Sequence, residues 1–314
     1  MARSLPAATP PDVLVLGGGG IVGEAWMNGV LAGLDEAEGF DSRACRRYVG
    51  TSAGSIVAAV LAAGVSPASR LGRLPEQPPA DGDGPGGGSP PLRRALGAVA
   101  AVGGSVAAPA VSLALRSAAP GGAVVRRALL ARVPRGRGSL EPLRREIERL
   151  GLRFDGRLLV SVVELESGRR LMLGSADAPE LPVARAVQAS CAIPGVFAPV
   201  RVDGRSYVDG GAWSPTSLDV CGAGRGDRVL CLNPTASLRP RLGDIAGAFG
   251  PVSRSIAAAE ALVLRRRGAR VTVVNPDGAS SAAMGSNLMN PRRRAGTIEA
   301  GLAQGRALAG RGGW

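Results

Sequence analysis

Short apolar runs that end in glycine alternate with helical patterns near the start of the chain. Residues 12–20 (DVLVLGGGG) predict a buried strand that runs into a glycine turn, and the apolar spacing of residues 24–34 predicts a helix after it. Residues 46–64 repeat this order, with a strand that ends at Gly50 and an apolar helix that ends at Gly64. Two successive strand–turn–helix units predict an α/β fold, with a mostly parallel central sheet and helices on its faces.

The second half of the chain also contains patterns typical of strands and helices. Residues 157–174 predict two strands about a turn at Ser167-Gly168, and residues 199–211 predict two short strands about Asp203-Gly204. Ser139 and Glu141 indicate the start of a helix. The other expected elements are a helix within 182–195, buried strands within 227–234 and 269–278, and a helix within 294–313.

Two segments interrupt this pattern. Residues 75–91 are rich in proline and glycine without periodicity, which predicts a disordered or mobile loop. Residues 95–115 contain no charge and could just span a bilayer, but glycines and a proline break the run and alanine contributes little transfer free energy. We therefore expect short helices packed on the core or covering the active site. The prediction is a single domain over 1–314 with a variable apolar helical insertion at 92–138.

Composition and charge narrow the class of protein. Apolar residues make up 45% of the 314 residues, which is enough for a hydrophobic core, but aromatic residues make up only 3%. The core should therefore consist mostly of alanine, valine and leucine. The formal net charge of +13 favours anionic partners.

The arginines that produce this charge are mostly scattered. The two dense runs are LRRRGAR (264–270) and PRRRAG (291–296), and no aromatic residues lie among them as base-stacking platforms. We therefore expect no nucleic-acid partner, and we expect any anionic partner to be a membrane surface that the protein contacts peripherally.

The cysteines give no indication of a metal site. Cys45, Cys191, Cys221 and Cys231 lie far apart in sequence, and the chain contains no histidine to complete a zinc site. We expect no metal and no cofactor. The apolar run near the N-terminus is too short for a signal peptide, so a reduced, cytoplasmic location is expected.

The glycine run GGGIVG (18–23) has two interpretations. It fits the dinucleotide-binding pattern G-x-G-x-x-G between a strand and a helix. Free backbone N–H groups at the start of a helix also bind other negative oxygens, including the oxyanion of an acyl-transfer intermediate.

A nucleophile motif follows this glycine run. The segment GTSAG (50–54) places Ser52 between small residues, after a strand and before a helix, as a strained nucleophile turn requires. An ordinary helix N-cap serine has the same local pattern. The motif alone does not separate these two interpretations.

The base that would activate Ser52 cannot be histidine or lysine, because the sequence contains neither. A serine mechanism would therefore need an aspartate or a glutamate as its base. Asp209, in YVDGG, stands where a predicted strand runs into two glycines. The alternative interpretation of this Asp-Gly pair is a hairpin turn.

These motifs together carry a family resemblance. In order along the chain, GGGIVG, GTSAG, ASCAIPGVFAPV (189–200) and DGG closely resemble the patatin-like phospholipases, a family of serine acyl hydrolases. The resemblance covers residues 12–65 and 157–235 well. It implies a three-layer patatin-like α/β fold and a Ser-Asp dyad without histidine.

The resemblance also implies roles for individual residues. Ser52 matches the nucleophile and Asp209 matches the base. The oxyanion-hole residues are expected to be Gly18, Gly19, Gly20, Gly23 and Ala53. One position departs from the family pattern: Val22 stands where the family usually carries arginine or lysine, so its cationic contribution to the oxyanion is absent.

The resulting prediction is a lipid acyl hydrolase, a phospholipase, lysophospholipase or simpler esterase, that forms an acyl-Ser52 intermediate. Burial is expected to raise the pKa of Asp209, against the loop dipoles that lower it. Two alternatives remain open from the sequence. A membrane-associated binding protein of the same fold would explain Val22. A nucleotide-binding oxidoreductase would explain GGGIVG but would leave Ser52 and Asp209 without a role.

Overall fold

The structure is a computed structural model, and it describes residues 10–38, 40–72, 120–134, 136–238 and 249–309. The predicted loop at 75–91 and the predicted apolar segment at 95–115 lie outside these ranges. The described part of the predicted insertion contains one helix, α5 (Pro120–Arg132).

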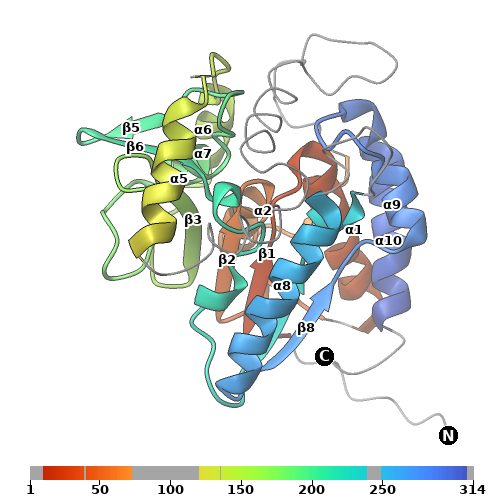
Figure 1. Ribbon diagram of the computed structural model, residues 1–314. Helices are drawn as coiled ribbons and strands as arrows, with labels where there is room; N and C mark the ends of the chain where they lie inside the picture. Colours follow the sequence, from red (N-terminus) through yellow and green to blue (C-terminus); the bar gives the residue numbers. More distant parts are fainter. Residues whose placement is uncertain (1–9, 39, 73–119, 135, 239–248, 310–314) are drawn as a thin grey trace, which may run out of the picture.

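A central, mostly parallel sheet runs through the molecule (Figure 1). Its order is β5-β6-β3-β2-β1-β7-β8, and β4 pairs with β3 beside this path. Strands β3, β2, β1, β7 and β8 pair in parallel, whereas β4, β5 and β6 form the antiparallel part. The strands are β1 (Val13–Leu16), β2 (Arg47–Thr51), β3 (Leu158–Glu164), β4 (Arg170–Leu173), β5 (Val200–Val202), β6 (Arg205–Asp209), β7 (Arg228–Leu232) and β8 (Arg270–Val274).

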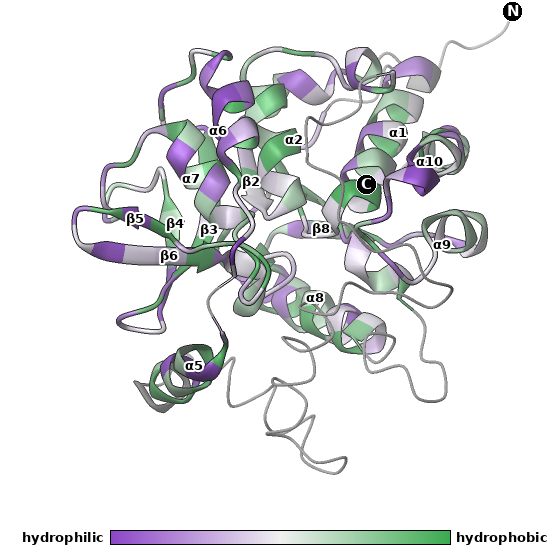
Figure 2. Cartoon of the chain, turned by 90° about the horizontal axis from the view of Figure 1, so that it is seen from above, coloured by the Kyte–Doolittle hydropathy of each residue, from purple (hydrophilic) through white to green (hydrophobic). Residues whose placement is uncertain are grey.

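Helices cover both faces of this sheet. Seen from above, α1, α2, α6 and α7 lie on one side and α8 lies on the other, while α10 packs outside α1 (Figure 2). The helices are α1 (Gly20–Glu38), α2 (Ala53–Ala62), α6 (Glu141–Glu148), α7 (Val183–Ser190), α8 (Phe249–Arg266), α9 (Gly278–Met284) and α10 (Arg294–Ala309). The predicted α/β fold with a mostly parallel, helix-flanked sheet is confirmed.

Strand β1 shows why the sheet needs helices on both faces. Leu14 and Leu16 belong to the larger core under α1 and α2, whereas Val13 and Val15 belong to a smaller core that includes Ala261 of α8. Successive side chains of a strand point to opposite faces, so a strand buried on both faces is a continuous apolar run. The sequence VLVL meets this requirement.

Most predicted elements are present, with shifted boundaries in some cases. Both predicted hairpins form, as β3–β4 and β5–β6. Helix α1 begins at Gly20, earlier than predicted, because its first turn contains the end of the glycine run. Helix α8 was not predicted: its first turn contains Pro251, which that position tolerates, and its C-terminal end was interpreted only as a basic run.

Candidate active site

Strands β2 and β6 pair with consecutive residues on the same edge of β3. Thr51, the last residue of β2, lies opposite Ser161, and Asp209, the last residue of β6, lies opposite Val162. Strand β4 pairs with the other edge of β3. Strand β6 therefore takes the place of β2 where β2 ends, and Ser52 and Asp209 leave the sheet at neighbouring points.

Ser52 adopts a backbone conformation that is unusual for a residue with a side chain. Its φ is 53° and its ψ is −126°, between the end of β2 and the start of α2. Both glycines of the motif are needed for close contacts: a Cβ on Gly50 would collide with Ser55, and a Cβ on Gly54 would collide with the carbonyl of Leu16. The segment is therefore a sharp strand-to-helix turn.

Buried serines hold the backbone of this turn. The N–H of Ser52 donates to Ser190 Oγ at 2.9 Å, and the Ser190 hydroxyl donates to the carbonyl of Ser161 at 2.7 Å. The Ser55 hydroxyl donates to the carbonyl of Ser52 at 2.6 Å. Ser190 was not singled out from the sequence, although it lies in the segment 189–200 that contributed to the family resemblance.

The Asp209 carboxyl is buried against Ser52. Asp209 is 5% exposed and Ser52 is 8% exposed. The carboxyl accepts hydrogen bonds from the Ser52 side chain and, at 2.7 Å, from the N–H of Gly211. Burial raises the pKa of Asp209 to about 6, although both hydrogen bonds oppose the rise. This carboxyl is therefore a stronger base than an exposed aspartate.

The glycine loop lies beside this pair. A Cβ on Gly18 would lie 3.3 Å from the Cβ of Ser52. The N–H of Gly18 donates to the carbonyl of Pro215 at 2.8 Å, and the N–H of Gly23 donates within α1 to the carbonyl of Gly19 at 2.8 Å. Neither N–H is available to an oxyanion in this conformation, so Gly18 and Gly23 shape the loop.

Three other backbone N–H groups of the predicted oxyanion set remain. Gly19 and Gly20 lie where α1 begins, and Ala53 is the first residue of α2. Within the described ranges, their N–H groups have no acceptor. The first N–H groups of a helix lack partners inside the helix, and such groups bind anions.

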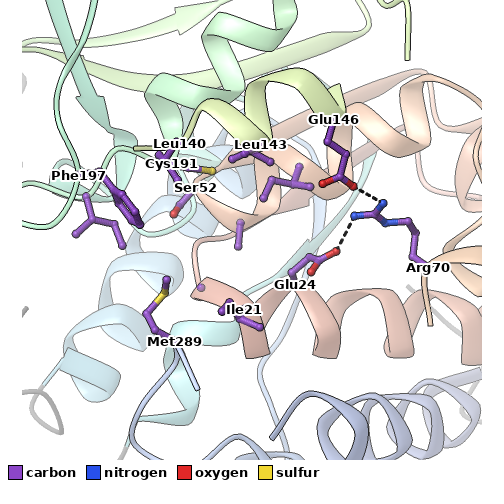
Figure 3. A pocket seen from close by; sticks show the side chains of 14 residues that line it. Ile21, Glu24, Ser52, Arg70, Leu140, Leu143, Glu146, Cys191, Phe197 and Met289 are labelled. Carbon is purple, nitrogen blue, oxygen red and sulfur yellow. Dashed lines mark hydrogen bonds and ion pairs between the residues drawn. The ribbon is translucent and has the colours of Figure 1, made fainter. Parts of the chain in front are cut away.

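A pocket opens over Ser52, and its lining is mainly apolar (Figure 3). Apolar walls come from helices α1 and α2, from α6 and the residue before it, from the segment after α7 and from the segment between α9 and α10. The apolar side chains that line it are Ile21, Ala53, Ile56, Leu140, Leu143, Ile193, Phe197 and Met289. An apolar lining beside the serine suits a hydrocarbon substituent.

Charged residues form one end of this pocket. Arg70, which ends the short helix η2 (Pro67–Arg70), pairs with Glu24 at 3.3 Å and with Glu146 at 2.6 Å. Burial raises the pKa of Glu24, while the charges of Arg70 and Arg294 lower it. This cluster cannot be identified from the sequence pattern, because its members come from separate elements.

The side chain of Val22 does not line the pocket. It is fully buried in the larger core, and its backbone N–H donates to the carbonyl of Leu288 at 3.2 Å. In this chain, the position where the family usually has a cation therefore contributes to core packing.

The two arginine runs lie at different edges of the sheet. Residues 264–270 lead into the start of β8, whereas the site lies at the C-terminal ends of the parallel strands. Residues 291–296 follow Met289 of the pocket wall, and Arg292 and Arg293 are exposed there. Only this second run lies near the pocket.

The described ranges contain neither a cluster of metal ligands nor a membrane-spanning helix. They hold no group of three or more histidine, cysteine or acidic residues placed to bind a metal. None of their helices has both the length and the apolar character that crossing a bilayer requires.

Comparison with known proteins assigns the family. Residues 14–221 match the family model of the patatin-like phospholipases, and the chain belongs to this family. The match includes the glycine loop, the Ser52 turn and Asp209, and the family supports lipid acyl hydrolase activity. It therefore favours the hydrolase over the nucleotide-binding interpretation of GGGIVG.

Individual relatives add less. No curated protein matches the chain. Among solved structures, VipD from Legionella pneumophila is similar with a TM-score of 0.46 and 17% identity, over 98% of this chain and 67% of VipD. This similarity is too low to support a conclusion about function.

Proposed function

We propose that the protein hydrolyses lipid acyl esters, with Ser52 as nucleophile and Asp209 as general base. The observation that carries this proposal is the hydrogen bond between the Ser52 side chain and the buried Asp209 carboxyl. The strained conformation of Ser52 supports it, since such strain is common at nucleophiles. The absence of histidine and lysine leaves a carboxylate as the available base.

In the first step, Ser52 Oγ attacks the ester carbonyl carbon and Asp209 takes its proton. The carbonyl oxygen becomes an oxyanion, for which the N–H groups of Gly19, Gly20 and Ala53 are the proposed donors. The tetrahedral intermediate then expels the alcohol, which receives the proton from Asp209. This leaves an acyl-Ser52 ester.

In the second step, Asp209 takes a proton from water as the water attacks the acyl-Ser52 carbonyl. The same N–H groups hold the second oxyanion. Its collapse releases the carboxylic acid and expels Ser52 Oγ, which takes back the proton from Asp209. A base with a pKa near the working pH suits both proton transfers, which is consistent with the raised pKa of Asp209.

The proposed substrates are lipids and simpler acyl esters. The apolar pocket wall would contact the acyl chain, while Arg292 and Arg293 would favour an anionic lipid surface near the pocket. Peripheral contact with such a surface is therefore part of the proposal. Loss of this contact at high salt would be expected from its electrostatic origin.

The direct test is hydrolysis of p-nitrophenyl butyrate by the wild type, Ser52→Ala and Asp209→Asn. Both variants should lose activity by a factor of at least about 100, because each removes a reacting group. Matched controls are Ser255→Ala on the exposed side of α8 and Asp203→Asn at the exposed tip of the β5–β6 hairpin. These should keep wild-type rates.

Circular dichroism on all five proteins should show equal folding. Activity that survives in folded Ser52→Ala or Asp209→Asn contradicts the dyad. A wild type that is inert towards short and long esters, but still binds lipid vesicles, would instead favour the binding-protein alternative.

A further inference from the structure

Two cavities meet at Phe197. The pocket at Ser52 has a free volume of about 30 Å³, and Ile193 and Phe197 form part of its wall. A second cavity of about 330 Å³ lies beside α5, and Pro194, Gly195 and Phe197 line it. The segment 193–197 therefore separates the two cavities, and Phe197 borders both.

The second cavity is lined mainly by aliphatic side chains, together with the polar residues Arg127, Glu166 and Ser206. Its lining includes aliphatic side chains from α5, from β6 and from the segments around them: Leu130, Ala131, Val133, Leu165 and Val208. Its volume falls in the range of cavities that hold small-molecule ligands, whereas the pocket at Ser52 has room for only a few atoms.

The partition is built from two paired segments. Gly138 and Phe197 form a parallel bridge, in which the N–H of Gly138 donates to the carbonyl of Val196 at 3.0 Å and the N–H of Ala198 donates to the carbonyl of Gly138 at 3.1 Å. The ring of Phe197 packs over Gly138, where a Cβ would lie 2.6 Å from a ring carbon. Contact with Gly138 therefore holds the Phe197 ring in the wall between the two cavities.

The opposite end of the Ser52 pocket is closed to a hydrocarbon. Figure 3 shows Phe197 and the Arg70 cluster at opposite ends of the pocket. Arg70, Glu24 and Glu146 satisfy one another as ion pairs, and Arg70 is 6% exposed. Pushing an acyl chain between buried ion pairs would separate charges without compensation. Among the described walls of the pocket, the apolar end at Phe197 is therefore the one along which a longer chain can be buried.

We propose that Phe197 sets the acyl-chain length that the enzyme accepts, by separating the Ser52 pocket from the apolar cavity beside α5. With Phe197 in place, the pocket takes acyl groups of a few carbons. Without its ring, the two cavities join and a medium-length chain extends from Ser52 into the second cavity. This inference rests on the proposed function, which it deepens by narrowing the proposed lipids and simpler acyl esters to those with short acyl chains.

The test compares kcat/KM for p-nitrophenyl butyrate, octanoate and laurate. The wild type should prefer butyrate, and Phe197→Ala should raise the laurate-to-butyrate ratio by about tenfold or more, as expected from newly buried methylene groups. Phe197→Trp keeps the partition and should keep the wild-type preference. Phe197→Leu is a milder substitution for the case in which Phe197→Ala does not fold.

A second substitution checks that the gain comes from the second cavity. Ala131 is exposed on α5 and lines this cavity, so Ala131→Trp should fill it. In the Phe197→Ala background, Ala131→Trp should remove the gain on laurate and leave the butyrate rate unchanged. An unchanged laurate-to-butyrate ratio in folded Phe197→Ala, or a gain that Ala131→Trp does not reduce, would overturn the proposal.

A binding measurement keeps this test separate from the proposed function. Laurate itself is titrated into the wild type and Phe197→Ala by calorimetry, a readout that needs no catalysis. Tighter binding to Phe197→Ala, by about tenfold, supports the proposal even where no ester is hydrolysed. Equal binding to both proteins, together with equal chain-length profiles, overturns it. A wild type without esterase activity contradicts only the proposed function.

Discussion

Thr51 and Asp209 lie opposite consecutive residues of one strand, β3, although 157 residues separate them in the sequence. The distance between the proposed nucleophile and its base is therefore a property of strand register. A slip of β6 by one residue would turn the Asp209 side chain to the other face of the sheet. The hairpin β5–β6 and the pairing with β3 hold that register.

Ser190 should affect catalysis without touching substrate. Its hydroxyl accepts the N–H of Ser52, so Ser190→Ala leaves that buried N–H without an acceptor. We expect kcat to fall about tenfold, since one unsatisfied hydrogen bond costs about 1–3 kcal/mol and part of that cost displaces Ser52. Steady-state kinetics of Ser190→Ala, with Ser255→Ala as the control, provides the measurement. A fall in stability with unchanged kcat would show that Ser190 has no positioning role.

Gly54 should not tolerate a side chain. A Cβ at this position would collide with the carbonyl of Leu16 in the central strand β1. Gly54→Ala should lower the free energy of unfolding by about 3 kcal/mol or more, because the backbone on both sides is fixed.

The control for this substitution is Gly296→Ala in α10, where an added Cβ meets nothing within 4 Å. It should leave stability unchanged or raise it by up to about 1 kcal/mol, as alanine favours helix more than glycine does. Urea unfolding of both variants gives the comparison. Equal stabilities would contradict the close packing of the Ser52 turn on β1.

The pH dependence of the wild type should report Asp209. A general base acts in its ionised form, and burial raises the pKa of Asp209 to about 6. Below this value kcat/KM should fall about tenfold per pH unit, and above it kcat/KM should reach a plateau. Product is best followed by chromatography, since nitrophenol absorbance itself changes with pH. An acid limb near pH 4, the range of an exposed aspartate, would contradict the buried base.

Glu260 of α8 should stabilise the loop that supports the glycine run. Its carboxylate accepts the hydroxyls of Ser214 and Thr216, each at 2.6 Å, and the N–H of Leu218 at 3.0 Å. Pro215, inside the same loop, accepts the N–H of Gly18. Glu260→Ala leaves these donors unpaired, so we expect a loss of about 3 kcal/mol in unfolding free energy and a lower kcat.

Glu299→Ala is the matched control, since it removes an exposed glutamate from α10. Its unfolding free energy should stay within about 0.5 kcal/mol of the wild type. Equal effects of the two substitutions in urea unfolding would show that the buried hydrogen bonds of Glu260 contribute little.

Much of the fold follows from local sequence. The run VLVL predicts a strand buried on both faces, and the glycines around Ser52 predict a sharp turn, because each signal lies within a few residues. Asp209 stood out among the acids for the same reason, as a carboxylate at the end of a strand before two glycines. Helix α8 was not predicted, because Gly250 and Pro251 in its first turn are residues that usually interrupt helices.

The contacts that support the site could not be derived this way. Ser190 and Ser52 are joined by a hydrogen bond across 138 positions of sequence. Arg70 meets Glu24 and Glu146 only once three separate elements pack together. The hydrogen bond from the N–H of Gly18 to the carbonyl of Pro215 likewise forms only in the folded chain. The glycine motif alone therefore does not predict which backbone N–H groups lack an acceptor.

The most direct test of the central claim is the rate at which an alkyl fluorophosphonate modifies Ser52, followed by mass spectrometry of the intact protein and its peptides. We predict one adduct on Ser52 in the wild type, none in Ser52→Ala, and a rate at least about 100-fold lower in Asp209→Asn, because the hydroxyl then lacks its base. An adduct on another residue, or equal rates in the wild type and Asp209→Asn, would contradict activation of Ser52 by Asp209.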